Sequence, residues 1–449
     1  MSSSSVSSSS VSSSSVSFTS VSFASSRYRR RHPLVATLVA LALLAAACGG
    51  SDPVDATDST ASTNTPETAP TTTGSPPETT TAPPTTTAPP TTEPPPTSAP
   101  TTTAPPPELD LLGAGPFSVG VATVTIDADT ERPLTVDVWF PLAEGTTGDP
   151  QQYTLLPGTF YESPDAIVAT ADSIATDGPF PLVVYSHGSG GLRYIHSNYT
   201  ETIASHGYVV VAPDHTGNTS LELIAGNADD PDVIAFNRPN DISNLLDAVL
   251  DPASAAGAFT PAIDAERIAV TGHSFGGYTA YAMVVGHDNP AGNIEPDDRV
   301  DAIIALAPAT GNGLLSDERL ASISVPTMII VGTDDATTPV DPNVDRPWEL
   351  STASPSYRVE LVAAEHQTFT DVCDYQDFLP TLDAVPDIIT STIDDFAEAG
   401  CQPDDMPIER AQELTNTFAL RFLDEVFSGG ETVVTDLSTI PDDVLFGTK

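Results

Sequence analysis

Apolar residues beyond residue 107 fall into short runs of two kinds. The runs at 118–126 and 134–140 alternate apolar and polar positions, which is typical of antiparallel strands with one exposed face. Most later runs, such as 182–186 and 327–331, are continuously apolar, which is typical of parallel strands buried on both faces. Further strands are predicted at 208–212, 267–271, 302–307 and 357–363. The pattern therefore predicts a mostly parallel sheet of eight strands.

Helical periodicity lies between and after these strands. We expect helices over 194–206, 241–250, 275–286 and 408–427. The last is amphipathic, and its apolar side carries Ile408, Leu414, Phe418, Phe422 and Val426. Strands that alternate with helices predict an α/β domain with helices on both faces of the sheet. No internal repeat of fixed period interrupts this pattern, so we expect one folded domain over 108–449.

The chain before residue 108 has a different composition. A Ser-rich lead and an arginine cluster precede an apolar stretch at 33–47, which is shorter than the ~20 residues of a membrane span and suits the core of a signal peptide. Residues 48–107 are mostly Thr, Pro, Ser, Ala and acidic residues, and this composition predicts an extended, disordered linker. We therefore expect a signal peptide over 1–47 and a tether over 48–107.

Cys48 directly follows three alanines, an arrangement that resembles a bacterial lipoprotein signal peptide. This resemblance implies that Cys48 carries lipid and that the protein is exported to the cell envelope, touching the membrane only through this anchor. The alternative is ordinary cleavage, which would leave a secreted protein with a free Cys48. In an exported domain the other two cysteines, Cys373 and Cys401, predict a disulfide, with two buried thiols as the alternative. The segment between these two cysteines is either a small cap that narrows an acyl pocket or a segment that only extends over the surface.

The net charge narrows the classes of partner. The chain has 61 acidic and 15 basic residues and a formal net charge of −46. A surface this acidic repels the phosphate backbone, which excludes nucleic-acid binding, and it favours neutral or zwitterionic substrates. The alternative interpretation is that the charge serves only solubility in a salty or extracellular setting.

The most informative motif is Gly272-His273-Ser274-Phe275-Gly276, which lies between the strand predicted at 267–271 and the helix predicted at 275–286. A sharp strand-to-helix turn lifts the central serine out of the backbone, and larger residues at the flanking glycines would clash. The motif therefore predicts a nucleophile elbow with Ser274 as the nucleophile. The alternative is a serine that only caps a helix.

A serine hydroxyl needs a base to take its proton, and in hydrolases with this elbow the acid and then the histidine follow the serine along the chain. His287 lies too near the end of the nucleophile helix to fold back, so His366, after the last strand, is the predicted base. Asp335, in the loop after 327–331, is the predicted acid, and Asp334 is the alternative. The acid would hold the imidazole tautomer and stabilise the imidazolium.

An oxyanion hole requires two N–H donors near the nucleophile. One predicted donor is the backbone of Phe275, and the other is the backbone of Ser189, in the glycine-rich loop after 182–186. A simple glycine-rich turn is the alternative. His187 and His215 lack the spacing of metal ligands, and we expect them to orient loops through hydrogen bonds.

No cofactor or metal is predicted. The acidic loop that holds Asp334, Asp341 and Asp345 lacks the glycine and the spacing of a calcium loop, so we interpret it as a solvated face.

Four segments carry a family resemblance: VVYSHGSGGLRYIHSNYTETIASHGYVVVAPDHTGNT, IAVTGHSFGG, VGTDDATTP and EHQTF. They resemble the platelet-activating factor acetylhydrolase type II and dienelactone-hydrolase-like group of α/β-hydrolases. The resemblance implies the α/β-hydrolase fold and a secreted carboxylic ester hydrolase acting on short-acyl esters, including acetyl esters of phospholipids. The stretch VPTMIIVGTDDATTPV also resembles cutinase-like polyesterases. This second resemblance makes polymeric esters an alternative class of substrate.

Two features of the resemblance bear on function. Dienelactone hydrolases use a cysteine nucleophile where this chain has Ser274, so ester hydrolysis is favoured over lactone opening. The alternative function from a different functional class is that of a non-catalytic binding protein with the same fold, because a fold alone does not determine activity.

Overall fold

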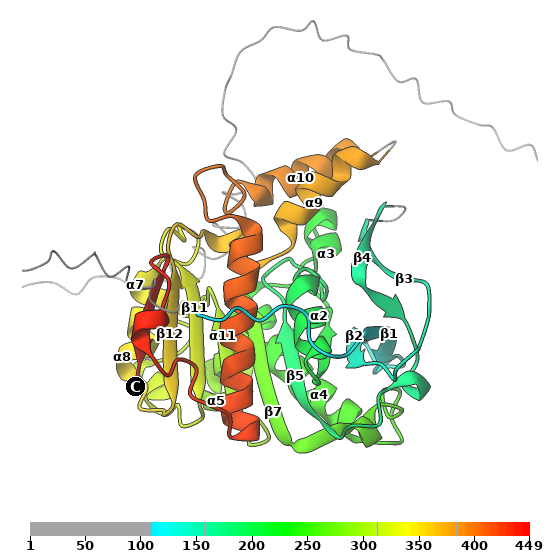
Figure 1. Cartoon of the computed structure of the whole chain (residues 1–449), viewed down its shortest axis with the longest axis horizontal. Coiled ribbons are helices and arrows are strands. Elements are labelled where there is room, and N and C mark those ends of the chain that lie inside the picture. The colour runs from blue at the N-terminus through cyan, green and yellow to red at the C-terminus, as the bar shows by residue number, and fades with distance from the viewer. Residues whose placement is uncertain (1–108, 157–158, 312, 383–384) are drawn as a thin grey trace, which may run out of the picture.

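The computed structural model of this protein describes residues 109–156, 159–311, 313–382 and 385–449, and these build a large sheet flanked by helices (Figure 1). The predicted signal peptide, Cys48 and the predicted linker lie outside the described residues. Across the sheet the strand order is β13-β12-β11-β10-β7-β5-β6-β2-β1-β4-β3. The strands β5, β6, β7, β10, β11 and β12 run parallel to their neighbours in this group, while β2 and β13 pair antiparallel at its two sides.

The strands of the sheet are β1 (Val119–Ile126), β2 (Leu134–Pro141), β3 (Pro150–Leu156), β4 (Thr159–Val168), β5 (Phe180–Ser186), β6 (Val209–Pro213), β7 (Ile263–His273), β10 (Ala302–Leu306), β11 (Thr327–Gly332), β12 (Ser356–Leu361) and β13 (Val444–Thr448). A separate hairpin joins β8 (His287–Asn289) to β9 (Gly292–Ile294). The α-helices are α2 (Ser197–Ser205), α3 (Ser220–Ala225), α4 (Pro231–Leu250), α5 (Phe275–Val285), α6 (Asp317–Ala321), α7 (Val340–Asn343), α8 (Asp345–Leu350), α9 (Val372–Phe378), α10 (Asp387–Ala397) and α11 (Ile408–Ser428). Short 3-10 helices are η2 (Ala171–Ser173), η3 (Thr260–Ala262), η4 (His366–Phe369), η5 (Leu379–Thr381) and η6 (Leu437–Thr439).

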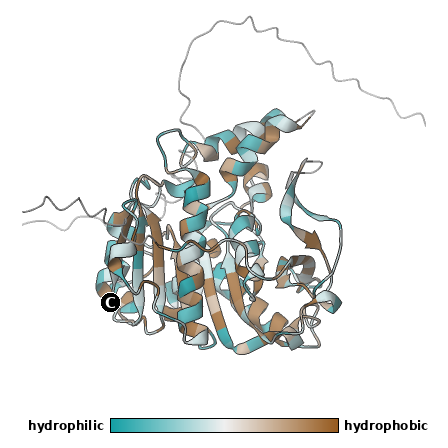
Figure 2. Ribbon diagram, in the orientation of Figure 1, coloured by the Kyte–Doolittle hydropathy of each residue, from teal (hydrophilic) through white to brown (hydrophobic). Residues whose placement is uncertain are grey.

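The continuously apolar strands are buried on both faces, because helices cover each side of the sheet. Along β5, Val183 and Tyr185 belong to one hydrophobic cluster, and Leu182 and Val184 belong to another. The first cluster includes side chains of α2 and α11, and the second includes side chains of α4 and α5. Figure 1 shows α11 lying across the front of the sheet, and Figure 2 shows hydrophobic residues concentrated along the central strands. The expected α/β architecture with helices on both faces is therefore confirmed.

The expected number of strands is wrong, because the sheet formed by the described residues has eleven strands rather than eight. All eight predicted strands are present, and the additional ones are β3, β4 and β13. These three strands lie at the two ends of the sheet. A strand there does not need to be buried on both of its faces. Their sequences, PQQYTLL, TFYESPDAIV and VLFGT, accordingly carry polar residues or a proline and give no strong apolar signal.

The four predicted helices are present as α2, α4, α5 and α11. The helix α4 begins at Pro231, ten residues before the predicted start at 241, because the helix continues through Pro239. Proline usually interrupts a helix, so its presence hid the first half of α4 from the sequence pattern. Within the described part of the chain, no helix combines the length and apolarity needed to cross a membrane.

Candidate active site

Ser274 lies at a sharp turn between β7 and α5. Its φ of 57° and ψ of −116° are unusual for a residue with a side chain, as expected for a nucleophile elbow. A Cβ atom on Gly276 would lie 1.8 Å from the backbone oxygen of Ser186, and one on Gly272 would lie 2.5 Å from the same atom. Both flanking positions therefore require glycine. The Ser274 side chain is 7% exposed, and no described residue donates a hydrogen bond to its hydroxyl or accepts one from it.

His366 and Asp335 form a buried pair. The His366 ring donates a hydrogen bond from Nδ1 to Oδ2 of Asp335 at 2.8 Å, and the two residues are 3% and 4% exposed. His366 begins η4, after β12, and Asp335 lies in the loop after β11. Asp334, the sequence alternative, instead accepts a hydrogen bond from the Thr333 hydroxyl at the surface. The structure thus brings Asp335, and not Asp334, to His366.

The surroundings of Asp335 keep its carboxylate ionised. Burial raises the pKa of Asp335, but attraction to His366 and hydrogen bonds from His366 and Thr338 outweigh burial and lower the pKa below its usual value. The backbone N–H groups of Thr337 and Thr338 donate to Oδ1 at 2.9 and 2.7 Å, and the Thr338 hydroxyl donates to Oδ2 at 2.9 Å. An ionised acid at Nδ1 leaves Nε2 of His366 free to accept a proton.

The His366 ring lies beside the nucleophile elbow. The ring of His273, the residue before Ser274, has its centroid 4.6 Å from that of His366 and donates from Nε2 to the His366 backbone oxygen at 2.9 Å. Burial, together with repulsion from His366, lowers the pKa of His273 well below its usual value, so His273 is neutral. The structure therefore gathers Ser274, Asp335 and His366 where β7, β11 and β12 end.

The glycine-rich loop after β5 runs beside Ser274. A Cβ atom on Gly188 would lie 3.3 Å from Cβ of Ser274, so the backbone that leads to Ser189 passes next to the nucleophile. The Ser189 hydroxyl accepts a hydrogen bond from Nδ2 of Asn218 at 3.1 Å. Phe275, the other predicted donor, is the first residue of α5. The loop that holds Ser189 thus runs beside Ser274, and Phe275 follows Ser274 directly in the chain.

His187 and His215 orient this loop, as expected. His187 donates from Nδ1 to the backbone oxygen of Gly188 at 2.7 Å and accepts at Nε2 from the backbone N–H of His215 at 3.1 Å. His215 donates from Nδ1 to Asp241 and accepts at Nε2 from the Ser186 hydroxyl, both at 2.9 Å. Burial is the largest cause that lowers the pKa values of both histidines well below their usual range, which keeps the rings neutral.

Sequence analysis missed Arg238, a residue of α4 that is fully buried under the same loop. Its guanidinium donates to the backbone oxygens of His187 and Gly188 at 2.6 and 2.9 Å. The only sequence signal was a single arginine in the stretch between β6 and β7, three residues before the helix predicted at 241–250. Nothing in that stretch indicates a contact with the loop after β5.

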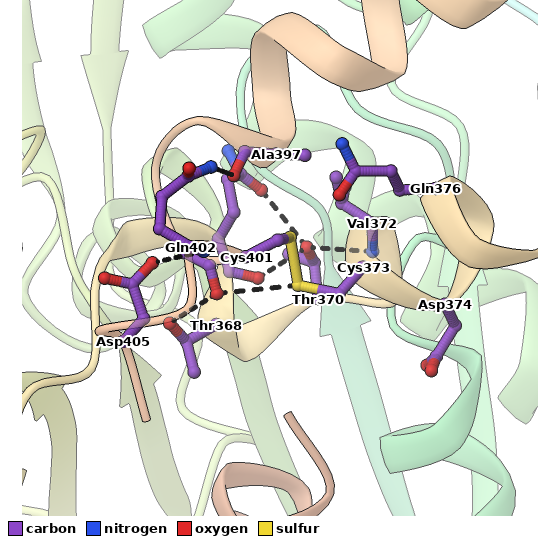
Figure 3. Close-up of a disulfide and its surroundings, with 12 residues drawn as sticks. Thr368, Thr370, Val372, Cys373, Asp374, Gln376, Ala397, Cys401, Gln402 and Asp405 are labelled. Atoms are coloured by element: carbon purple, nitrogen blue, oxygen red, sulfur yellow. Dashed lines mark hydrogen bonds between the residues drawn. A yellow bond between two sulfur atoms is a disulfide. The ribbon is translucent and has the colours of Figure 1, made fainter. Parts of the chain in front are cut away.

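The predicted disulfide between Cys373 and Cys401 is confirmed. Figure 3 shows Thr368, of the turn that carries His366, close to this disulfide. The backbone N–H of Gln367 donates to the oxygen of Ala399 at 2.6 Å, and the Thr368 hydroxyl donates to the oxygen of Gly400 at 3.5 Å. The disulfide-bonded segment is therefore attached to η4 directly after His366.

The segment between the two cysteines contains α9 and α10, which pack on each other around Tyr375, Leu379 and Ile389. Tyr161 of β4 joins this packing, with ring centroids 5.1 Å from Tyr375 and 5.5 Å from Phe378. Figure 1 places both helices above the sheet, on the side where α3 and the start of β4 also lie. The segment is thus a compact helical pair that packs against β4, as a small cap does.

A cavity of about 430 Å³ lies elsewhere, between the N-terminal part of the domain, α2 and α11. None of the predicted site residues lines it. Among the described residues, no group of three or more His, Cys, Asp or Glu side chains is placed to hold a metal ion.

Comparisons with known proteins bear on the fold and on the family that the chain is similar to. Among solved structures, a ferulic acid esterase from Streptomyces cinnamoneus superposes with a TM-score of 0.55 and 23% identity, over 75% of this chain and 98% of that chain. The chain has the α/β-hydrolase fold. A model of the chlorophyllase family matches residues 160–321 of this α/β-hydrolase, a span that contains Ser189, Arg238 and Ser274 but ends before Asp335 and His366.

Two curated relatives match parts of this α/β-hydrolase. Chlorophyllase-1 of Arabidopsis thaliana is 30% identical over 151 residues, which are 33% of this chain and 40% of that protein. A platelet-activating factor acetylhydrolase of Cavia porcellus is 25% identical over 143 residues, which are 24% of this chain and 32% of that protein. The chain thus spans well under half the length of these relatives. The resemblance to platelet-activating factor acetylhydrolases that the motifs indicated is confirmed.

Proposed function

We propose that this α/β-hydrolase is a serine carboxylic ester hydrolase with Ser274 as its nucleophile. The observation that carries the proposal is the buried His366–Asp335 pair, which lies beside a strained serine at a strand-to-helix turn. A buried carboxylate costs free energy unless it is well bonded, and this one accepts four hydrogen bonds that fix one imidazole tautomer. A base held in this way is what a serine nucleophile requires.

The reaction proceeds in two halves. Nε2 of His366 takes the proton of the Ser274 hydroxyl while Oγ attacks the ester carbonyl carbon, and the carbonyl oxygen becomes an oxyanion that accepts hydrogen bonds from the N–H groups of Ser189 and Phe275. The tetrahedral intermediate collapses, and the alcohol leaves with the proton from His366. Water then gives a proton to His366 and attacks the acyl carbon on Ser274. The second tetrahedral intermediate collapses as the Ser274 oxygen leaves and takes that proton back from His366, and the acid is released.

The proposed substrates are neutral or zwitterionic short-acyl esters, among them acetyl esters of phospholipids. Two observations support this class: the likeness to a platelet-activating factor acetylhydrolase, and the net charge of −46, which disfavours anionic esters. The compact pair of α9 and α10 on the side of the sheet where the strands end is consistent with a limited acyl pocket.

Hydrolysis of p-nitrophenyl acetate, butyrate and octanoate by the wild type and by Ser274→Ala tests this proposal. We expect activity that falls with acyl length and disappears in the variant. A preference for octanoate would favour a cutinase-like polyesterase or lipase instead. If both proteins bound esters without hydrolysing them, the catalytic proposal would be wrong, and a binding protein on the hydrolase fold would replace it.

A further inference from the structure

Arg238 makes five polar contacts under the loop that holds Ser189, and they come from all three nitrogens of its guanidinium. Nη1 donates to the backbone oxygen of His187 at 2.6 Å and to the Ser186 hydroxyl at 3.3 Å. Nη2 donates to the backbone oxygen of Gly188 at 2.9 Å and lies 3.2 Å from Nδ1 of His187. The remaining contact runs from Nε to Oδ1 of Asn218 at 2.9 Å. Because the guanidinium is planar and its N–H donors point in fixed directions, it fixes the positions of two successive backbone carbonyl groups, those of His187 and Gly188.

The geometry of the peptide bond carries this effect to Ser189. The carbonyl of Gly188 and the N–H of Ser189 belong to one planar trans unit, so they point in opposite directions. Arg238 holds the Gly188 oxygen toward α4, and the side chain of His187 and the N–H of Gly191 donate to the same oxygen. The N–H of Ser189 must therefore point away from the guanidinium.

Arg238 also contacts the other predicted donor of the oxyanion hole. Its guanidinium lies over the ring of Phe275, with the central carbon 5.3 Å from the ring centroid. The same side chain thus packs against Phe275 and binds the carbonyl of Gly188, the residue before Ser189. The Asn218 amide adds a second link, because it accepts from Arg238 through Oδ1 and donates to the Ser189 hydroxyl through Nδ2.

The charge of Arg238 faces carbonyl and amide oxygens. Among the described residues no carboxylate forms a salt bridge with it, since the nearby Asp241 is paired with Arg132 and His215. Burial lowers the pKa of Arg238 to about 9, so the guanidinium remains positive at neutral pH. A buried positive charge in water-excluded surroundings stabilises negative charge that develops nearby more strongly than it would in water.

We infer that Arg238 is a positioning residue for the oxyanion hole: it aims the Ser189 N–H by holding the His187 and Gly188 carbonyls, and its charge favours the oxyanion. This inference rests on the proposed ester hydrolysis. It differs from a purely structural role, in which Arg238 would only attach α4 to the sheet. A positioning role lowers kcat and the affinity for a tetrahedral adduct, whereas a structural role lowers the fraction of folded protein.

The test compares Arg238→Gln and Arg238→Lys with the wild type and with Arg299→Gln in the full-length protein. Arg299 is the matched control, because it also braces α4, through Asp247 and the Ser243 backbone oxygen, but it does not contact the loop after β5. For each protein we would measure kcat and KM with p-nitrophenyl acetate and the inhibition constant of an aryl trifluoromethyl ketone, which forms an oxyanion adduct with the serine. Active sites counted with a fluorophosphonate correct for unfolded protein.

We expect Arg238→Gln to lower kcat about 100-fold, which is in the range found when one oxyanion donor is lost. The inhibition constant of the ketone should rise by a similar factor, and KM should change little. The kcat and the ketone affinity of Arg238→Lys should lie between those of the wild type and of Arg238→Gln, because lysine keeps the positive charge but lacks the fixed, forked arrangement of N–H donors. Arg299→Gln should lower the melting temperature and leave kcat per active site unchanged. A folded Arg238→Gln protein with wild-type kcat and ketone affinity would overturn the inference.

Two further outcomes are distinguishable. If the wild type does not hydrolyse the ester, the proposed function fails by itself, before Arg238 is tested. If neither Arg238 variant folds, Asn218→Ala decides, because it removes the acceptor of Nε and the donor to Ser189 while leaving the arginine in place. A several-fold loss of kcat and of ketone affinity in this variant would support the inference, and unchanged values would contradict it.

Discussion

At the scale of single residues, the Asp335 carboxylate shows how local contacts determine chemistry. Three of its hydrogen bonds come from Thr337 and Thr338, so the loop after β11 has already positioned the carboxylate before His366 binds it. Asp334, its neighbour, is held at the surface by Thr333. Because the two aspartates are adjacent, the sequence favoured Asp335 but left Asp334 as the alternative. The loop conformation decides between them, because it points the Asp335 side chain inward and leaves Asp334 exposed.

The first prediction concerns this pair. Asp335→Asn should lower kcat by about 10³-fold or more, because an amide can stabilise the wrong imidazole tautomer and cannot stabilise the imidazolium. Asp334→Asn is the matched control, and its kcat should remain close to that of the wild type. Steady-state kinetics of both variants is the measurement. Loss of activity in Asp334→Asn with retention in Asp335→Asn would reverse the assignment.

The second prediction concerns Glu201, a buried acid of α2 outside the candidate site. Burial raises its pKa to about 7, although the hydroxyls of Tyr153 and Ser163 donate to it at 2.5 and 2.8 Å. Since the folded-state pKa lies above the unfolded value, the folded state binds the proton more tightly. The stabilisation that this proton contributes to the folded state is fully present below about pH 4.5, and it is lost as the pH rises through about 7.

Glu201→Gln should therefore become more stable than the wild type as the pH rises from 4.5 to 7. Relative to its value at pH 4.5, the difference in unfolding free energy should increase by about 3 kcal/mol and level off above pH 7, on the order of what such a pKa shift implies. Urea unfolding at several pH values is the measurement, and Glu409→Gln, at an exposed position, is the control. A difference that does not change with pH would show that Glu201 ionises normally in the folded protein.

At the scale of elements, the turn η4 connects the candidate base to the disulfide. It receives support from β12 before it and from Ala399 and Gly400 beside it, and Cys401 follows these two residues directly. Without the disulfide, the residues that hold η4 would be tied to α9 only by weaker contacts. The cysteine pair could be predicted from the sequence, but its contact with η4 could not, because it depends on how α10 returns toward β12.

The third prediction follows from this connection. Replacing both cysteines, by Cys373→Ser with Cys401→Ser, should lower the unfolding free energy by roughly 3 to 4 kcal/mol in the chain-entropy model. It should also lower kcat several-fold, because the turn that carries His366 loses its support. Calorimetry and steady-state kinetics, with and without a phosphine reductant, are the measurements. The reductant should reproduce both effects in the wild type and add nothing in the double variant; a double variant with wild-type kcat would separate the disulfide from the site.

Elements at the centre of the sheet were predictable for a physical reason. A parallel strand covered on both faces must be apolar at nearly every position, as β5 and β11 are, so its sequence is distinctive. The end strands β3, β4 and β13 do not have this requirement and were missed. The elbow was predictable because its motif, Ser274 between Gly272 and Gly276, lies within five consecutive residues, although the atom that both glycines approach is the backbone oxygen of Ser186 in β5. The contact of Arg238 is not local, since it arises from the packing of α4 against the loop after β5.

At the scale of the whole molecule, the sheet brings together residues that are far apart in the sequence. Ser274, Asp335 and His366 follow β7, β11 and β12, whose parallel order with β10 between them aligns their ends. The positive charge of Arg238 lies inside this assembly, while the chain as a whole is strongly acidic. A substrate of the proposed reaction therefore meets a negative long-range field before it reaches the proposed oxyanion hole.

The fourth prediction follows from this field. An ester with an anionic group, such as a sulfonated aryl acetate, should have a lower kcat/KM than its uncharged analogue at low ionic strength. The ratio should approach one as salt is raised, because the Debye length falls from about 30 Å at 0.01 M to about 10 Å at 0.1 M. The uncharged ester provides the control and should respond little to salt. Equal salt dependence of the two esters would show that the field does not reach the site.

The most direct test of the central claim is the identification of the residue that a fluorophosphonate labels in the active protein. Mass spectrometry of the digested protein should show one adduct, on Ser274, whose stoichiometry rises as ester hydrolysis falls. Labelling should be absent in Ser274→Ala and strongly slowed in His366→Ala, because the hydroxyl then lacks its base. Inactivation by an adduct on any other residue, or full hydrolysis after Ser274 is completely labelled, would contradict the account.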